Sequence, residues 1–304
     1  MIRNLRLLSA APLLLCLAIC PPARSEDGSA RHDLEARASS GDVAATLELA
    51  KDYFCGNNGP ADPQKAAALF LDAAKKGNPE AMDWTGVLLA NGKGIPRDEK
   101  QAMQWFQKSA DLGHARGMLH LGLLHRQAKD LPTSNEEGLA WLKKASDVGE
   151  IEATAIVGRI YFGGDRLQPA DPKAAVDYLT KAAEAGDPVC QNMLGLLFRN
   201  GGPVGANRET AKVLFRKAAL QNNAKAQANL ALELGAGTPD APERAEALAW
   251  LMLSKDQNEI TAKRAFAEIS SNLPPGILTE AQKIADELKK TLPPAKKSAF
   301  PSGQ

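Results

Sequence analysis

The stretch "TGVLLANGKGIPRDEKQAMQWFQKSADLG" (residues 85–113) holds two blocks of apolar residues at helical spacing, separated by a loop rich in Gly and Pro. Asp98 stands where the second block begins, and its side chain can accept hydrogen bonds from the free N–H groups of a first helical turn. Gly113 closes the stretch and suits the left-handed conformation in which many helices end. The stretch therefore predicts two helices joined by a loop.

The same pattern recurs along the chain at an almost constant interval. A closing glycine or asparagine followed by a polar residue returns after 36, 36, 36, 37 and 36 residues, at Gly41, Gly77, Gly113, Gly149, Gly186 and Asn222. Nine positions after each lies a small residue: Ala50, Gly86, Gly122, Gly158, Gly195 and Ala231. A later column is large: Leu69, Trp105, Trp141, Tyr178, Leu214 and Trp250. Such self-similarity is typical of stacked repeats, and small residues let paired helices approach closely.

Capping residues and composition agree with helix pairs. The second helix of each unit is expected to start at a polar cap, at Asp62, Asp98, Ser134, Asp171 and Asn207. Pro63 and Pro172 follow two of these caps, at the first helical position, where a missing N–H costs nothing. Aromatic residues make up only 5% of a chain that is 44% hydrophobic, which favours Ala- and Leu-rich helices over strands.

The pattern resembles the Sel-1-like repeat family, a relative of the tetratricopeptide repeat. The residues that carry the resemblance are the opening stretch, "VGRIYFGGDRLQPADPKAAVDYLTKAAEAG" (157–186) and "LGLLFRNGGPVGANRETAKVLFRKAALQN" (194–222). The resemblance implies an all-α fold, a right-handed α-solenoid of about six antiparallel helix pairs with a C-terminal capping helical segment.

The register sets the predicted boundaries. The repeats are expected at 41–76, 77–112, 113–148, 149–185, 186–221 and 222–258. Capping helices are expected within 259–292, the second of them from Thr279, because a polar terminal helix covers the open end of a stack. We expect residues 26–40 to be a linker and residues 293–304 to be a disordered tail.

The first 25 residues have the pattern of a secretory signal peptide. A basic start, "MIRNLR", precedes the apolar run "LLSAAPLLLCLAIC", and Ala23 and Ser25 offer a small-residue cleavage site. The alternatives are an uncleaved anchor and a lipoprotein acylated at Cys20. We predict export across the inner membrane to a periplasmic location, and a mature chain that does not span the membrane. The net charge of +1 argues against nucleic-acid binding.

Neither a metal site nor catalytic machinery is expected. Three of the four histidines, His114, His120 and His125, fall in one predicted helix. Their spacing points them in different directions or far apart along the axis, so they cannot converge on one ion. The sequence has no G-x-S-x-G, P-loop or H-E-x-x-H motif. We predict a protein that is not an enzyme and binds no cofactor.

Two cysteines remain outside the predicted signal peptide. Cys190 stands in a column of small buried residues and should behave as a small hydrophobic side chain. Cys55 ends the first helix of repeat one, where we expect a tolerated surface residue; the alternative is a thiol that reacts or pairs with another chain. Four repeats separate the two, so we expect no bridge between them.

In the related tetratricopeptide architecture, the first helix of each pair lines a concave face. By that resemblance, three columns of the first helices would form a groove for a partner protein or peptide. The predicted groove residues are Leu47, Lys51, Phe54, Asp83, Val87, Leu119, Leu123, Arg126, Arg159, Phe162, Asn192, Leu196 and Arg199. This apolar stripe with arginines suits a segment with hydrophobic anchors and acidic groups. The alternative is that several of these leucines pack only against neighbouring repeats.

The sequence thus predicts an exported scaffold or regulator that binds a partner protein. A second hypothesis is an enzyme, because a cysteine-rich branch of the same family is associated with binding or hydrolysing β-lactams. That branch carries a cysteine pair in each repeat, and this chain departs from it. A third hypothesis is redox sensing or covalent dimerisation through Cys55.

Overall fold

The computed structural model of the chain describes residues 29–127, 135–165, 168–235, 241–270 and 275–294. Those residues contain fifteen α-helices and no strand. They divide into two compact units, unit 1 up to residue 153 and unit 2 from residue 154. The predicted signal peptide lies outside the described residues, as do residues 295–304 of the predicted tail. None of the described helices is long and apolar enough to cross a membrane.

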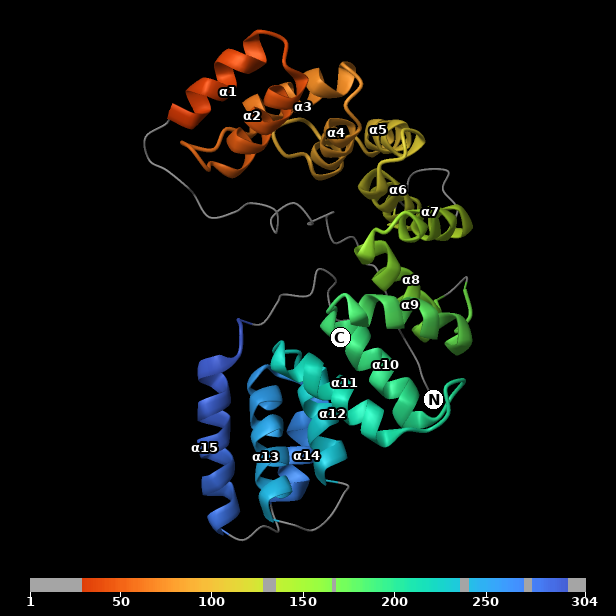
Figure 1. Ribbon diagram of the computed structural model, residues 1–304, viewed down its shortest axis with the longest axis vertical. Coiled ribbons are helices and arrows are strands. Elements are labelled where there is room, and N and C mark those ends of the chain that lie inside the picture. Colours follow the sequence, from red (N-terminus) through yellow and green to blue (C-terminus); the bar gives the residue numbers. More distant parts are fainter. Residues whose placement is uncertain (1–28, 128–134, 166–167, 236–240, 271–274, 295–304) are drawn as a thin grey trace. The chain divides into compact units, whose positions relative to one another are not determined.

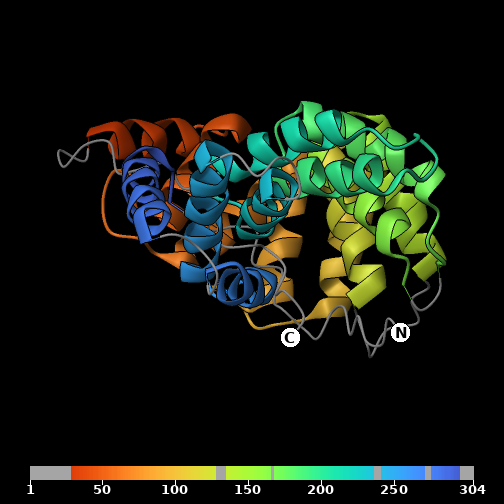
Figure 2. The same cartoon turned by 90° about the horizontal axis from the view of Figure 1, so that it is seen from below.

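Unit 1 is a row of helix pairs preceded by a single helix (Figure 1). Its helices are α1 (Ser29–Ser39), α2 (Val43–Cys55), α3 (Pro63–Lys75), α4 (Pro79–Asn91), α5 (Glu99–Asp111), α6 (Ala115–Gln127) and α7 (Asn135–Asp147). Each first helix packs on its own second helix and on the second helix of the preceding pair. The same helices, in red to yellow-green, can be followed from below in Figure 2.

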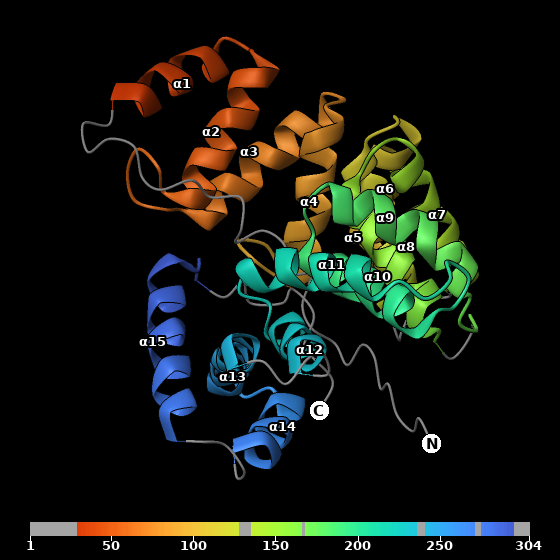
Figure 3. The same cartoon turned by 60° about the horizontal axis from the view of Figure 1, so that its bottom comes forward.

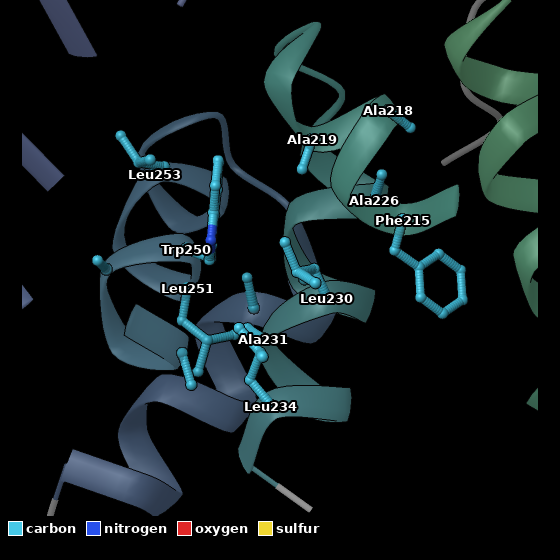
Figure 4. Close-up of a cluster of buried hydrophobic side chains, with 14 of the residues drawn as sticks. Phe215, Ala218, Ala219, Ala226, Leu230, Ala231, Leu234, Trp250, Leu251 and Leu253 are labelled. Carbon is cyan, nitrogen blue, oxygen red and sulfur yellow. The ribbon is translucent and has the colours of Figure 1, made fainter. Parts of the chain in front are cut away.

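Unit 2 continues the pattern and adds two helices at its end. It contains most of α8 (Ile151–Gly163), then α9 (Pro172–Glu184), α10 (Pro188–Asn200), α11 (Arg208–Leu220), α12 (Ala224–Gly235), α13 (Ala241–Asp256), α14 (Ile260–Ser270) and α15 (Pro275–Thr291). A core of Ala, Leu, Phe and Trp side chains from α11, α12 and α13 fills its C-terminal half (Figure 4). The two predicted capping helices exist, and α15 begins four residues before the expected start at Thr279.

The predicted caps are present wherever the structure describes them. The side chains of Asp62, Asp98, Asp171 and Asn207 each accept a hydrogen bond from a backbone N–H of the following helix. Asp98 also shows the electrostatic consequence, since hydrogen bonds from Gln101 lower the pKa of its carboxyl. Ser134 lies outside the described residues.

Two expectations about local structure are corrected. Residues 29–39, expected to be a linker, form helix α1. Arg31 of α1 forms an ion pair with Asp52 and donates to the carbonyl oxygen of Pro60, 3.1 Å away. The Tyr53 hydroxyl donates to Glu35 over 2.6 Å and lowers the pKa of that carboxyl. These contacts hold a helix that contains no buried residue, which is why apolar periodicity did not predict it.

The second correction concerns the large core column. Leu69, Trp105, Trp141, Tyr178 and Leu214 are only half-buried, although Trp250 is buried. The residues one position later are all fully buried: Phe70, Phe106, Leu142, Leu179, Phe215 and Leu251. One residue corresponds to about 100° around a helix. The residues of the later column therefore point directly at the small residues of the first helix. Those of the earlier column lie at the edge of this contact.

Asn222 stands where five other repeat turns have glycine, and it fastens the end of α15. Its φ of 62° is left-handed. Its Oδ1 accepts hydrogen bonds from Gln227, 3.1 Å away, and Gln257, 2.8 Å away. Its Nδ2 donates to the carbonyl oxygen of Pro293 over 2.8 Å. The side chain thus joins the turn between α11 and α12 to the residues just after α15.

Asn222→Gly is expected to lower the free energy of unfolding by about 1 kcal/mol. Glycine relieves the left-handed backbone, but the loss of hydrogen bonds near the buried Gln227 costs more. Asn258 is the matched control, because it too is left-handed, with φ 66°, and bonds only the exposed Lys263. Asn258→Gly should be neutral or stabilising. Urea denaturation and hydrogen exchange in α15 measure both effects. Equal changes for the two variants would contradict the stabilising role of the Asn222 side-chain hydrogen bonds.

Candidate functional site

The apolar groove residues predicted in unit 1 are buried. They are Leu47, Phe54, Val87, Leu119 and Leu123, and none is more than 6% exposed. Phe54 meets Trp84 of the next pair edge-on, with ring centroids 5.2 Å apart, and Trp84 stacks on Phe70. This corrects the prediction of an apolar stripe open to a ligand here. The side chains are core because consecutive first helices pack against one another through these columns.

Several polar groove residues join consecutive first helices. Lys51 of α2 lies 2.8 Å from Glu80 of α4. Burial lowers the pKa of Lys51, but its hydrogen bonds to Glu80 and Glu48 outweigh burial and raise it. Asn192 of α10 is buried and accepts a hydrogen bond from Asn229 of α12 over 2.7 Å. These residues link successive repeats.

The tightest of these joints is a buried pair in unit 1. Asp83 Oδ1 of α4 lies 2.6 Å from His120 Nδ1 of α6, and both side chains are nearly inaccessible to water. The Phe106 ring lies 5.3 Å from the imidazole, centroid to centroid. The other imidazole nitrogen, Nε2, is buried and has no hydrogen-bond partner among the residues that the structure describes. The pair is surrounded by packed side chains, and this placement favours a structural link between α4 and α6 over a reactive site.

Sequence reasoning missed this pair, although it left a signal. Asp83 is a charged residue in a column otherwise occupied by Leu47, Leu119, Ala155 and other uncharged residues. His120 lies 37 residues later, one column over, in the next repeat. Polar residues 37 positions apart in these two adjacent columns indicate a polar pair between neighbouring repeats, and Asn192 and Asn229 form a second pair with the same spacing. In the part of the chain that the structure describes, no group of three His, Cys, Asp or Glu side chains could hold a metal ion.

Partly accessible groove residues remain, most of them in unit 2. Arg126 in unit 1 and Arg159, Phe162, Leu196 and Arg199 in unit 2 are half-buried. Three further residues have the same degree of exposure: Met193 on α10, and Asn229 and Leu232 on α12. We use the name "α8–α10–α12 face" for Arg159, Phe162, Met193, Leu196, Arg199, Asn229 and Leu232. Neighbouring members on each helix lie three residues apart, about 60° around the helix axis, so they form one continuous band along each first helix.

Arg199 is held in place on the α8–α10–α12 face. Its Nη1 donates to Asn229 Oδ1 over 3.2 Å, and its Nε lies 3.9 Å from Glu233. Its guanidinium carbon lies 5.7 Å from the centroid of the Phe215 ring. Asn229 is fixed in turn by Asn192. An arginine oriented in this way can bind a carboxylate with less loss of side-chain freedom than a mobile one.

The two cysteines outside the predicted signal peptide differ. Cys190 is free and buried, and burial raises the pKa of its thiol far above the usual range. It behaves as the predicted small core residue. Cys55 is disulfide-bonded in the full-length chain, and not to Cys190. Because the other two cysteines, Cys16 and Cys20, belong to the predicted signal peptide, redox sensing or dimerisation through Cys55 in a cleaved chain stays a hypothesis.

Comparison with known proteins agrees with this architecture. The sequence profile described as "Sel1 repeat" matches residues 43–78, 79–114, 115–150, 151–187, 188–223 and 224–258. Each match begins about two residues after the boundary expected from the sequence. A search of curated protein sequences finds no significant match.

The solved structures that are similar to the chain include the following two. A protective antigen present in uropathogenic Escherichia coli strains, which displays an SLR fold, is 26% identical over 92% of this chain, with a TM-score of 0.79. The chain spans 62% of that protein's length. A Sel1 repeat protein from Oxalobacter formigenes is 23% identical over 76% of this chain and 95% of its own, with a TM-score of 0.66. Six consecutive matches over paired helices establish that the chain belongs to the Sel1 repeat family.

Proposed function

We propose that the protein is an exported, non-enzymatic scaffold or regulator that binds a partner protein along the α8–α10–α12 face. The observation that carries the proposal is the combination, on that face, of partly accessible Leu196 and Leu232 with an oriented Arg199. Repeated first helices offer a row of similar positions to an elongated ligand. Such a row suits a peptide segment better than a small molecule.

The chemistry of the face defines the partner segment. Leu196 and Leu232 occupy equivalent positions in consecutive repeats and would contact apolar anchors. Arg159 and Arg199 would contact carboxylates between or beside those anchors. We propose an extended or helical segment in which apolar residues alternate with Asp or Glu.

Export is part of the proposal and rests on the first 25 residues, which have a basic start, an apolar run and a small-residue cleavage site. The non-enzymatic role rests on a sequence without nucleophile-and-base motifs. A scaffold in the bacterial envelope would meet its partner there.

Site-specific photocrosslinking in intact cells tests the α8–α10–α12 face. A photoreactive amino acid at Leu196 or Leu232 is expected to give one discrete adduct each with the same envelope protein. Val213 is the control position, because it is 53% exposed on α11 and does not belong to the face. Introducing Arg199→Glu should reduce the Leu196 adduct several-fold, since the charge facing the partner is reversed.

Arg216→Glu is the matched charge control, because Arg216 lies on α11 and pairs with Glu246. It should leave the Leu196 adduct unchanged. An adduct of equal strength from Val213, or equal losses for the two charge reversals, would place the binding surface elsewhere.

A further inference from the structure

Each repeat is closed by a large residue of its second helix packed against a small residue of its first. The large residue lies seven positions before the turn glycine or asparagine, and the small one nine positions after the preceding turn. A Cβ added to Gly86 would lie 2.6 Å from the Phe106 ring, and one on Gly195 would lie 2.6 Å from Phe215. All six large residues are fully buried. A second helix without its first helix would therefore expose its large side chain, which we call the knob. A first helix alone would expose the space beside its small residue, which we call the notch.

Among the described residues, helix α1 is such a second helix without a paired first helix. It ends in a left-handed turn at Gly41, as second helices end at Gly77 and Gly113. It packs on α2 in the way that α3 packs on α4. Counting back seven residues from Gly41 reaches Leu34, in the column of the buried large residues, and eleven reaches Ala30, in a column of buried alanines. Leu34 is only half-buried and Ala30 is exposed.

The helix α14 is the opposite case, an unpaired first helix. It follows the left-handed turn at Asn258. Ala262 is buried against the preceding pair, as the corresponding Ala45 and Ala81 are. Ala267 stands in the column of Gly86 and Gly122 but is exposed, and Ile260 at the start of the helix is 64% exposed.

Helix α15 does not supply the missing partner of α14. It packs mainly on α13. Both Figure 1 and Figure 3 place α13 between α15 and α12. Helix α15 therefore lies on the side of α13 opposite to α12, the first helix with which α13 pairs. On the side of α14 where a second helix would pack, marked by the exposed Ala267, the described residues place no helix.

We infer that copies of this chain associate head to tail, with α14 of one copy and α1 of the next forming a composite repeat. Leu34 would enter the notch at Ala267, as Leu142 packs at Gly122 within repeat three. A second copy is the fitting occupant, because in the described part of the chain α1 and α14 are opposite halves of a repeat in the same register. The contact is heterologous, so its repetition produces chains of copies in which each end is used once.

Sedimentation velocity of the purified protein over a concentration series up to the millimolar range tests this inference. The wild type is expected to shift continuously to larger species as the concentration rises. Ala267→Arg fills the notch, and Ala30→Arg blocks the knob; both positions are exposed, so neither variant should disturb folding. Each variant alone should stay monomeric. Leu34→Asp is a second knob variant, and hydrogen exchange in α1 confirms that α1 stays docked.

Mixing the two blocked variants gives the sharpest result. Ala267→Arg keeps an open α1, and Ala30→Arg keeps an open α14, so an equimolar mixture should form a 1:1 dimer and nothing larger. Val213→Arg, on an exposed α11 position outside both ends, should associate like the wild type. A wild type that is monomeric at every concentration overturns the inference. So does association that survives both blocking variants, or a mixture that stays monomeric.

Discussion

Asp83→Leu is expected to lower the free energy of unfolding by about 3 kcal/mol, the typical cost of removing one partner of a buried polar pair. The substitution leaves His120 buried, with Nδ1 deprived of the carboxylate that lies 2.6 Å away in the wild type. Because His120 Nε2 already has no partner, the whole imidazole would be unsatisfied. Leucine itself fits the column, since Leu47 and Leu119 are buried at the equivalent positions. The destabilisation would come from His120.

The double variant Asp83→Leu/His120→Met separates the pair from its surroundings. Equivalent positions hold Ile156 and Met193 in other repeats, and methionine adapts to irregular space. With both polar groups gone, neither of the two positions leaves a buried polar atom without a partner, and the double variant should lie within about 1 kcal/mol of the wild type. Urea denaturation of the wild type, both single variants and the double variant gives the coupling energy. Additive single losses would show that the pair is not the cause.

The repeat framework was predictable because its signals are local and recur six times. Cap residues such as Asp62 and Asn207, and turn glycines such as Gly77, act within a few residues of their own position, and the structure confirms them. Recurrence then removed the ambiguity that each short pattern has alone. The family match over 43–258 agrees with this register.

The exposure of the groove columns was not predictable in the same way. Helical spacing indicates that Leu119 and Leu123 share a face, but it does not say how far the neighbouring first helix covers that face. The extent of this cover depends on the angle and distance between consecutive helix pairs. Small changes in the side chains at the interface set both. In unit 1 the large apolar members of these columns are core, whereas in unit 2 Leu196 and Leu232 stay partly accessible. The same pattern thus gives different surfaces in different repeats.

Helix α1 was missed for another reason. Its position in the register, with Leu34 and Ala30 in second-helix columns, was present in the sequence. Its apolar face is weak, because in the described residues it packs on the following first helix α2 and has no paired first helix of its own. Its attachment depends on Arg31 and Glu35. A search for buried periodicity finds complete repeats and overlooks half repeats at the ends of a stack.

Gly138→Ala is expected to lower the free energy of unfolding by about 2 kcal/mol, although repeat statistics favour alanine there. The equivalent residues are Ala66, Ala102, Ala175, Ala211 and Ala247. A consensus argument therefore predicts stabilisation, and helix propensity alone predicts a gain of about 1 kcal/mol. Repeat three is different because it has glycine on both helices. A Cβ at Gly138 would lie 2.8 Å from the carbonyl oxygen of Gly122 and 2.6 Å from Arg126 Cγ.

The backbone contact decides the sign of this change. The Arg126 side chain can rotate away, but the Gly122 carbonyl belongs to the backbone of α6, so the two helices would have to separate. Separation loosens the buried contact of Leu142 with α6 and costs packing energy throughout the pair. The control is Gly235→Ala, at the exposed end of α12, where an added Cβ meets nothing within 4 Å. This variant should be neutral or slightly stabilising in urea denaturation. If Gly138→Ala were equally harmless, α6 and α7 would not be held at the close approach seen here, and the consensus argument would prevail.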